Sequence, residues 1–268
     1  MKKLLIIDPQ NDFCDIPGAA LPVAGAYADM LRLADFIANT GLDGITVTLD
    51  SHPSVAVERT TFWKTAEGSA PAPFTFVTGN DVASGKLLPR DALLTPKVTS
   101  MLAQLAQAGR PGLVVWPVHC VTGTWGHNIA APLAEQLARW EFAQQRAVRK
   151  VLKGEYPLTE HFGVFEADAP DAGVASTQFN TELAAELTAG VDTLFVAGEA
   201  GSHCVASSID QLMRYLDRSG GPRPRIVLLS DCMSPVTGFE ADQQAFIERA
   251  TRWGAELMTT AQAQAALN

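Results

Sequence analysis

The segment Val191–Leu212, VDTLFVAGEAGSHCVASSIDQL, predicts a buried strand, a tight turn and a helix in direct succession. Residues 193–197 form an apolar run with the length of a buried parallel strand, which Gly198 and Gly201 then interrupt. The apolar residues that follow recur with helical spacing. Cys204 is therefore expected at the N-terminus of a helix.

A cysteine at that position has two interpretations. Unpaired N–H groups and the helix macrodipole favour an anion, so the pKa of the Cys204 thiol is expected to fall and the thiolate to act as a nucleophile. The same N–H groups can stabilise an oxyanion. The alternative is a buried core cysteine that merely follows a glycine turn. The segment alone leaves both possibilities open.

Composition limits the classes of function. The 268 residues are 47% hydrophobic, and we expect one domain, 1–268, around one core. A net charge of -9 leaves no basic patch for phosphates, so neither nucleic acid nor an anionic membrane is an expected partner. No apolar run has membrane-spanning length, and the N-terminal MKKLLIIDPQNDF predicts a first strand rather than a signal peptide.

The cysteines indicate the compartment. Cys14, Cys120, Cys204 and Cys232 lie far apart, without CxxC pairs, in a chain too large to need disulfide staples. We therefore expect a reduced, cytoplasmic protein.

Polar residues follow several of the predicted strands. Asp8 follows the apolar run 4–7, at the end of a parallel strand where ligands bind in open α/β sheets. A lone aspartate there could equally cap the next turn. The strand 147–152 similarly delivers Lys150 and Lys153, although lysines at such positions are commonly solvated.

Two further strand ends carry metal-ligand types. Asp50 and His52 follow the strand 44–49 and are two residues apart, so an extended backbone points both side chains the same way. His119 follows the strand predicted over 112–115. An aspartate and two histidines at strand ends predict a metal site with three protein ligands and open positions for catalysis.

A long segment, 54–96, interrupts the alternating pattern. It is expected to be irregular, since it is rich in proline, glycine, alanine and threonine with scattered aromatic residues. Such an insertion is usually a lid, a binding loop or an interface arm. The alternative is a surface insertion packed by its own aromatic side chains. The remaining βαβα alternation predicts an α/β fold, a three-layer αβα sandwich around a mainly parallel, Rossmann-like sheet.

The motifs occur in an order that resembles a known family. The motifs are, in order, IIDPQNDF, D-x-H-P, W-P-x-H-C-V-x-G-T-x-G, Lys-Gly and G-x-x-x-x-x-C-V. With these motifs the chain resembles the isochorismatase-like cysteine hydrolases, most closely their nicotinamidase branch. The likeness covers nearly the whole chain and is weak through the insertion.

The resemblance implies a role for each matched residue. The catalytic residues would be Asp8, Lys153 and Cys204, with Lys153 preferred over Lys150 because a glycine follows it. The implied metal ligands are Asp50, His52 and His119, holding a divalent ion such as zinc, iron or manganese. Phe13 and Trp116 would stack on the substrate. The oxyanion donors would be the amides of Ala200 and Cys204, next to a cis peptide bond between Glu199 and Ala200.

Two positions depart from the family pattern. Many nicotinamidases have another histidine shortly after D-x-H-P, where this chain has Ser54 to Glu58. Either Glu58 replaces it as an oxygen ligand, or water completes a shell with three protein ligands. Glu199 is polar where relatives tend to be apolar, and the sequence gives no interpretation of it.

The implied activity is that of a nicotinamidase-like amidohydrolase acting through a thioester on a small-molecule amide, in a homo-oligomer. Alternatives are a cysteine amidase for a ureido, maleamate or biuret-like substrate, or a catalytically silent α/β binding module. Isochorismatase itself is less compatible, because the resemblance implies that its reaction does without the cysteine. A nucleotide-binding module is disfavoured because the chain lacks G-x-G-x-x-G and G-x-x-x-x-G-K-[ST].

Overall fold

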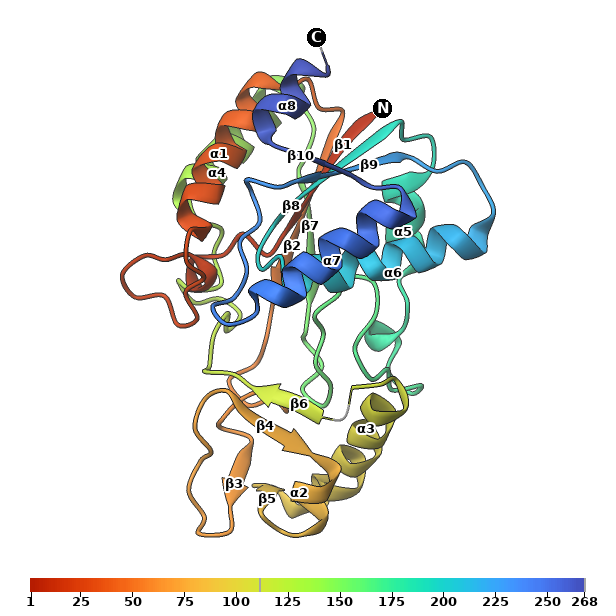
Figure 1. Ribbon diagram of the computed structural model, residues 1–268. Helices are drawn as coiled ribbons and strands as arrows, with labels where there is room; N and C mark the ends of the chain where they lie inside the picture. The colour runs from red at the N-terminus through yellow and green to blue at the C-terminus, as the bar shows by residue number, and fades with distance from the viewer. Residues whose placement is uncertain (111, 268) are drawn as a thin grey trace.

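A six-stranded parallel sheet forms the centre of the computed structural model, which describes residues 1–110 and 112–267 (Figure 1). Its strand order is β10-β9-β8-β1-β2-β7. The strands are β1 (Lys2–Ile7), β2 (Gly44–Asp50), β7 (Arg149–Lys153), β8 (Thr193–Gly198), β9 (Arg225–Leu229) and β10 (Glu256–Met258). The first strand is thus central, as its apolar sequence predicts.

Helices cover both faces of this sheet. One face carries α1 (Ala26–Asn39), α4 (Ala131–Gln144) and α8 (Thr260–Ala265), and the other carries α5 (Thr181–Thr188), α6 (Cys204–Ser219) and α7 (Glu240–Trp253). The predicted three-layer αβα sandwich with a mainly parallel sheet is therefore confirmed.

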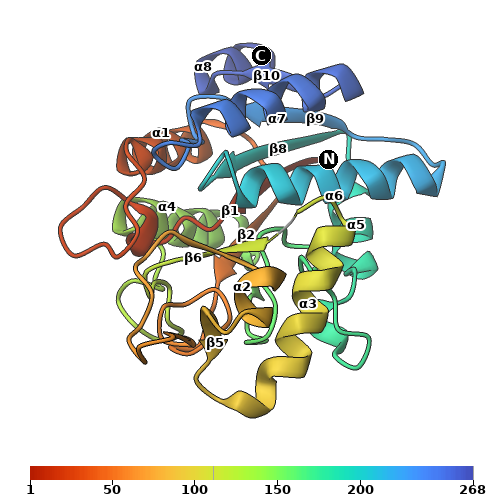
Figure 2. The same ribbon diagram turned by 60° about the horizontal axis from the view of Figure 1, so that its bottom comes forward.

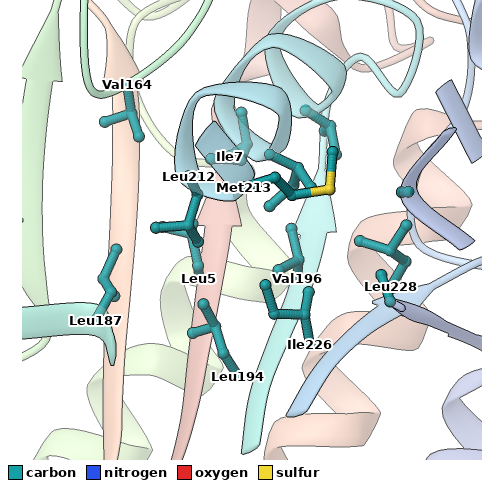
Figure 3. Packing of buried hydrophobic residues seen from close by; sticks show 14 of the residues in the cluster. Leu5, Ile7, Val164, Leu187, Leu194, Val196, Leu212, Met213, Ile226 and Leu228 are labelled. Carbon is teal, nitrogen blue, oxygen red and sulfur yellow. The ribbon is translucent and has the colours of Figure 1, made fainter. Parts of the chain in front are cut away.

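Alternating side chains of the central strands supply both cores. Leu5 and Ile7 of β1 point to the layer of α6, where they pack in one cluster with Leu212 and Met213 (Figure 3). Leu4 and Ile6 point to the opposite layer and join the cluster of α1 and α4. This alternation follows from the period of two along a strand. It fixes the strand register, because a slip of one residue would exchange the two faces.

The insertion is a folded lobe, so the expectation of an irregular segment over 54–96 is wrong. The lobe contains β3 (Trp63–Thr65), β4 (Thr75–Thr78), α2 (Gly79–Ala83) and β5 (Leu87–Pro89), followed by α3 (Thr95–Gln107) and β6 (Gly112–Val115). It lies below the main sheet in Figure 1 and comes forward in Figure 2. Its own core includes Trp63, Val77, Leu102 and Leu113. Strands of three or four residues are too short for periodicity to reveal them.

The strand over 112–115 exists but belongs to this lobe. It pairs antiparallel with β4, so its expected place in the main parallel sheet is wrong. A short apolar run indicates burial but does not identify the partner strand. We propose that the chain 1–268 is still a single domain, because the segment after β6 includes Val121, which pairs with His52 just beyond β2.

Within residues 1–110 and 112–267, no helix combines the length and the apolarity needed to cross a membrane.

Candidate active site

Neighbouring strands deliver polar side chains to one edge of the main sheet. Asp50, the last residue of β2, stands opposite Lys153, the last residue of β7. Ile7 of β1 stands opposite Gly198 of β8, so Asp8 leaves the sheet beside the turn that precedes α6. Because the carboxyl ends of parallel strands share an edge, these side chains can meet.

The ammonium group of Lys153 joins the three other polar groups. Its Nζ lies 2.9 Å from Asp8 Oδ2, 2.8 Å from Asp50 Oδ1 and 3.6 Å from Cys204 Sγ. All four residues are buried. The structure thus brings together Asp8, Lys153 and Cys204, which the resemblance implied as catalytic. Lys150, in contrast, has a side chain that is 48% exposed.

The electrostatics differ from the sequence-based expectation at the cysteine. Burial raises the pKa of the Cys204 thiol well above its usual value, and the nearby Lys153 ammonium opposes this only in part. The expected low pKa is therefore wrong. Burial also raises the pKa of Asp8, which hydrogen-bonds to the thiol. A raised pKa makes a carboxylate a better proton acceptor. This pair suits a reaction in which the proton leaves Sγ during attack.

The turn between β8 and α6 offers two backbone donors. The peptide bond between Glu199 and Ala200 is cis, as the resemblance implied, and α6 begins at Cys204. Among the described residues, the amides of Ala200 and Cys204 donate to no protein acceptor. Gly198 makes the turn possible, because its φ is 116° and a Cβ there would lie 2.0 Å from the carbonyl oxygen of Ile7. Two available N–H groups beside a nucleophile suit an oxyanion.

Asp50 lies between the two predicted metal-binding histidines. Its Oδ1 is 2.8 Å from His52 Nε2, and its Oδ2 is 3.4 Å from His119 Nε2. One carboxylate and two converging imidazole nitrogens are donors that zinc, iron and manganese accept. In the described part of the chain, no group of three or more His, Cys, Asp or Glu side chains has the spacing of a metal centre. Asp50 and His52 instead hydrogen-bond to each other.

His119 reaches this group although β6 lies outside the main sheet. After β6 the chain runs alongside the residues that follow β2. The N–H of His52 donates to the carbonyl of Cys120, and the N–H of Thr122 donates to the carbonyl of His52, both at 3.2 Å. Residues 120–122 therefore hold His119 beside Asp50. Pairing of β6 with a strand of the main sheet, which the sequence predicted, would have had the same effect.

Glu58 contacts the far side of His52. Its Oε1 lies 2.9 Å from His52 Nδ1 and 3.1 Å from Arg59 Nε, whereas His52 Nε2 faces Asp50. Glu58 thus contacts Nδ1 of His52, the imidazole nitrogen that points away from Asp50. A carboxylate in this position fixes the orientation of a ligating histidine. Of the two possibilities left open by the sequence, the geometry favours three protein ligands without Glu58.

An aromatic pocket opens in front of the cysteine. It is lined by Phe13, Leu21, Asp50, Trp116, His119, Glu160, Phe162, Ala200, His203, Cys204 and Val236. Phe13 and Trp116, the residues expected to stack on a substrate, both belong to its wall. The ring of His203 lies 5.3 Å from that of Trp116 and 5.4 Å from that of Phe162. A flat, small substrate fits such a lining better than an extended polar one.

Sequence reasoning missed Glu160, Phe162 and His203. Glu160 is buried, and its pKa is raised to about 8, first by burial and then by the negative charge of Glu58. Its carboxyl is a further oxygen donor beside Asp50 and His119. Residues 160 and 162 lie in a stretch with only loop-like signals, and no motif marks them. The position of His203 immediately before the cysteine was the one available signal.

The pocket predicts which cysteine reacts. Cys204 is 7% exposed and lines the pocket, whereas the other three cysteines are fully buried. Iodoacetamide is therefore expected to alkylate Cys204 before Cys14, Cys120 and Cys232. Peptide mapping over a labelling time course measures the order. Equally fast labelling of Cys14 or Cys120 would contradict the assignment.

Comparison with known proteins identifies the fold. No protein-family model matches the chain. An isochorismatase-like hydrolase of Alkaliphilus metalliredigens superposes with a TM-score of 0.55 and 16% identity, over 100% of this chain and 99% of that one. The resemblance predicted from the motifs is therefore confirmed for the fold, which is that of the isochorismatase-like hydrolases.

Nicotinamidases are similar in sequence as well as in fold. The nicotinamidase of Saccharomyces cerevisiae is 24% identical over 210 residues, which are 78% of this chain and 79% of the yeast protein. The yeast structure superposes with a TM-score of 0.64 and 19% identity, over 96% of this chain and 99% of that one. It has also been solved with the inhibitor nicotinaldehyde. A pyrazinamidase of Pyrococcus horikoshii, solved in complex with zinc, superposes with a TM-score of 0.53 and 19% identity. The match covers 96% of this chain and 98% of that one.

Proposed function

We propose that this chain is a metal-dependent cysteine amidohydrolase that converts nicotinamide to nicotinic acid and ammonia. The observation that carries the proposal is the single buried ammonium of Lys153, which contacts both the Asp8 carboxylate and the Cys204 sulfur. The aromatic pocket in front of Sγ and the similarity to nicotinamidases support it.

The geometry supports the following reaction. Asp8 accepts the thiol proton while Cys204 Sγ attacks the carboxamide carbon, forming a C–S bond and an oxyanion. The amides of Ala200 and Cys204 donate to that oxyanion. When the oxyanion collapses, the C–N bond breaks and protonated Asp8 gives its proton to the departing nitrogen, which leaves as ammonia. Water then hydrolyses the thioester, returning the thiol and releasing the acid.

Lys153 keeps the charges of this site in balance. Its ammonium lies between two carboxylates, those of Asp8 and Asp50, so neither is left as an uncompensated buried charge. It also favours the anionic form of the sulfur as the proton leaves. Asp50, His52 and His119 would hold the divalent ion. When bound, the ion supplies a positive anchor for a substrate atom.

Metal content tests the ligand assignment. We expect one divalent ion per chain, and His52→Ala and His119→Ala should each remove it. Glu58→Ala should keep the ion but weaken its binding by about 10- to 100-fold, because only the orientation of His52 is lost. Elemental analysis and competition with a chelating dye measure both quantities. Complete loss of metal in Glu58→Ala would instead make Glu58 a ligand.

Substrate choice tests the pocket. In nicotinamide the ring nitrogen can bind at the anchor while the carboxamide reaches Cys204, so remote binding energy orients the reacting carbon. Benzamide lacks that nitrogen and should react roughly two orders of magnitude more slowly. Pyrazinamide keeps it and should still be hydrolysed. Equal rates for benzamide and nicotinamide, or faster hydrolysis of a linear ureido amide, would favour the related-amidase hypothesis.

The remaining expectations are also proposals. All four cysteines lie among the described residues and are free. Free cysteines support the proposal that the protein functions in a reducing, cytoplasmic compartment. We retain the expectation of a homo-oligomer. Light scattering on the purified protein would decide it.

A further inference from the structure

Glu199, the residue that the sequence left unexplained, is a fully buried acid in the turn between β8 and α6, next to the Ala200 amide. Its Oε2 accepts a hydrogen bond from the N–H of Ser234 at 3.2 Å. Among the described residues, its Oε1 has no donor. The carboxyl group of Asp29 lies within hydrogen-bonding reach of that of Glu199. Two carboxyl groups can bond to each other only when one of them carries a proton.

The other contacts of the pair show which carboxyl carries it. Asp29 already accepts from two donors, the Arg32 guanidinium through Oδ1 and the Ser234 hydroxyl through Oδ2 at 2.6 Å. Both oxygens of Asp29 therefore act as acceptors. Burial raises the pKa of Glu199 well above its usual value, and the Asp29 charge raises it further. Since both Asp29 oxygens already accept from other donors, the proton of the pair is assigned to Glu199, whose hydroxyl would donate to Asp29.

This pair lies where two functional segments are joined. The N–H of Gly201 donates to the carbonyl of Ser234 at 2.8 Å, and the N–H of Val236 donates to the Ser202 hydroxyl at 3.1 Å. Val236 is part of the pocket wall. The segment 232–236 thus supports the turn that carries the Ala200 amide. The Glu199 side chain connects this segment to Asp29 of α1.

We propose that Glu199 is a positioning residue, whose carboxyl, hydrogen-bonded to Ser234 and placed beside Asp29, keeps the Ala200 amide aimed at the oxyanion that forms when Cys204 attacks. The inference rests on the proposed amide hydrolysis. It assigns Glu199 no contact with the substrate. Loss of the Glu199 carboxyl should therefore lower the rate of reaction and weaken oxyanion binding. It should change the binding of the nicotinamide ring little.

Three variants separate this role from a merely structural one. Glu199→Gln keeps a neutral group that can donate to Asp29 and accept from Ser234, so kcat should stay within about threefold of wild type. Glu199→Leu removes both bonds and should lower kcat by about 100-fold, with KM little changed, because a misplaced group affects the reacting geometry. Ser234→Ala is the intermediate case. It leaves the N–H that Glu199 uses but removes the hydroxyl that donates to Asp29, so it should lower kcat less than Glu199→Leu does.

Inhibitor binding supplies a second readout. The Cys204 thiol can add to the aldehyde carbon of nicotinaldehyde, and the resulting oxygen would lie at the Ala200 amide. Glu199→Leu should weaken nicotinaldehyde more than nicotinic acid, which needs no such addition. Hydrogen exchange of the peptide that covers residues 198–204 gives a third readout. It should be faster in Glu199→Leu than in wild type and unchanged in Glu199→Gln.

The outcomes distinguish this inference from the proposed function. Failure of the wild-type protein to hydrolyse any amide overturns the proposed function, while hydrogen exchange still decides whether Glu199 holds the turn. If Glu199→Gln loses as much activity as Glu199→Leu, the neutral carboxyl is refuted. If Glu199→Leu lowers only the unfolding temperature and keeps wild-type kcat and exchange, the positioning role is refuted. Should Glu199→Leu fail to fold, Glu199→Gln still decides between the neutral and the charged form.

Discussion

Cys204→Ala is expected to lower kcat/KM for nicotinamide by at least about 10,000-fold, because no other group can form the acyl intermediate. Among the described residues, Cys204 is the sole cysteine that lines the pocket, and its sulfur contacts the Lys153 ammonium. The rate enhancement that remains in Cys204→Ala should be the smaller part that comes from substrate binding and from the oxyanion donors. Ammonia release at saturating and limiting nicotinamide measures the loss.

The control for this variant is Cys14→Ala. Cys14 is fully buried and belongs to the core between the sheet and α1. It should lose some stability and keep its kcat, because it contacts none of the reacting groups. Retention of substantial activity in Cys204→Ala, or equal losses in both variants, would refute the nucleophile assignment.

Asp8→Asn is the second variant with a large expected effect. The amide has the size of the carboxylate and can still accept from the Thr48 hydroxyl, which donates to Asp8 Oδ1. It cannot take the thiol proton, so kcat should fall by about 1,000-fold, within the range usual for a general base. Lys153 keeps its partner Asp50, and the fold should persist.

Nicotinic acid binding and thermal unfolding are the companion measurements for Asp8→Asn. Both should stay close to wild type, since the pocket wall is unchanged. A rate within tenfold of wild type would show that another group accepts the proton. A large fall in the unfolding temperature would mean that the lost rate reflects a damaged site.

The predicted site came from strand ends, which sequence patterns locate well. Asp8, Asp50 and Lys153 each follow a recognisable apolar run, and parallel strands bring such residues to one edge. His119 is in the predicted place for a different reason, since its strand joins the lobe while the residues after it pair with His52. The prediction that His119 and Asp50 lie together therefore rested on a partly wrong topology.

Other features depend on contacts that one sequence does not encode locally. The pKa of Cys204 reflects burial, which exceeds the opposing effect of the Lys153 ammonium. Which nitrogen of His52 faces Glu58 is decided by the fold of the lobe. Glu160 enters the pocket from a stretch without periodic signal, so its place in the pocket wall could be recognised only from the structure.

The most direct test of the proposed function is ammonia release by the purified, metal-loaded protein from nicotinamide, compared with a panel of small amides. We expect one ammonia for each nicotinic acid formed, with nicotinamide and pyrazinamide turned over far faster than benzamide or a linear ureido amide. The proposed function is contradicted if no ammonia is released from nicotinamide while another amide of the panel is hydrolysed, or if no amide reacts at all.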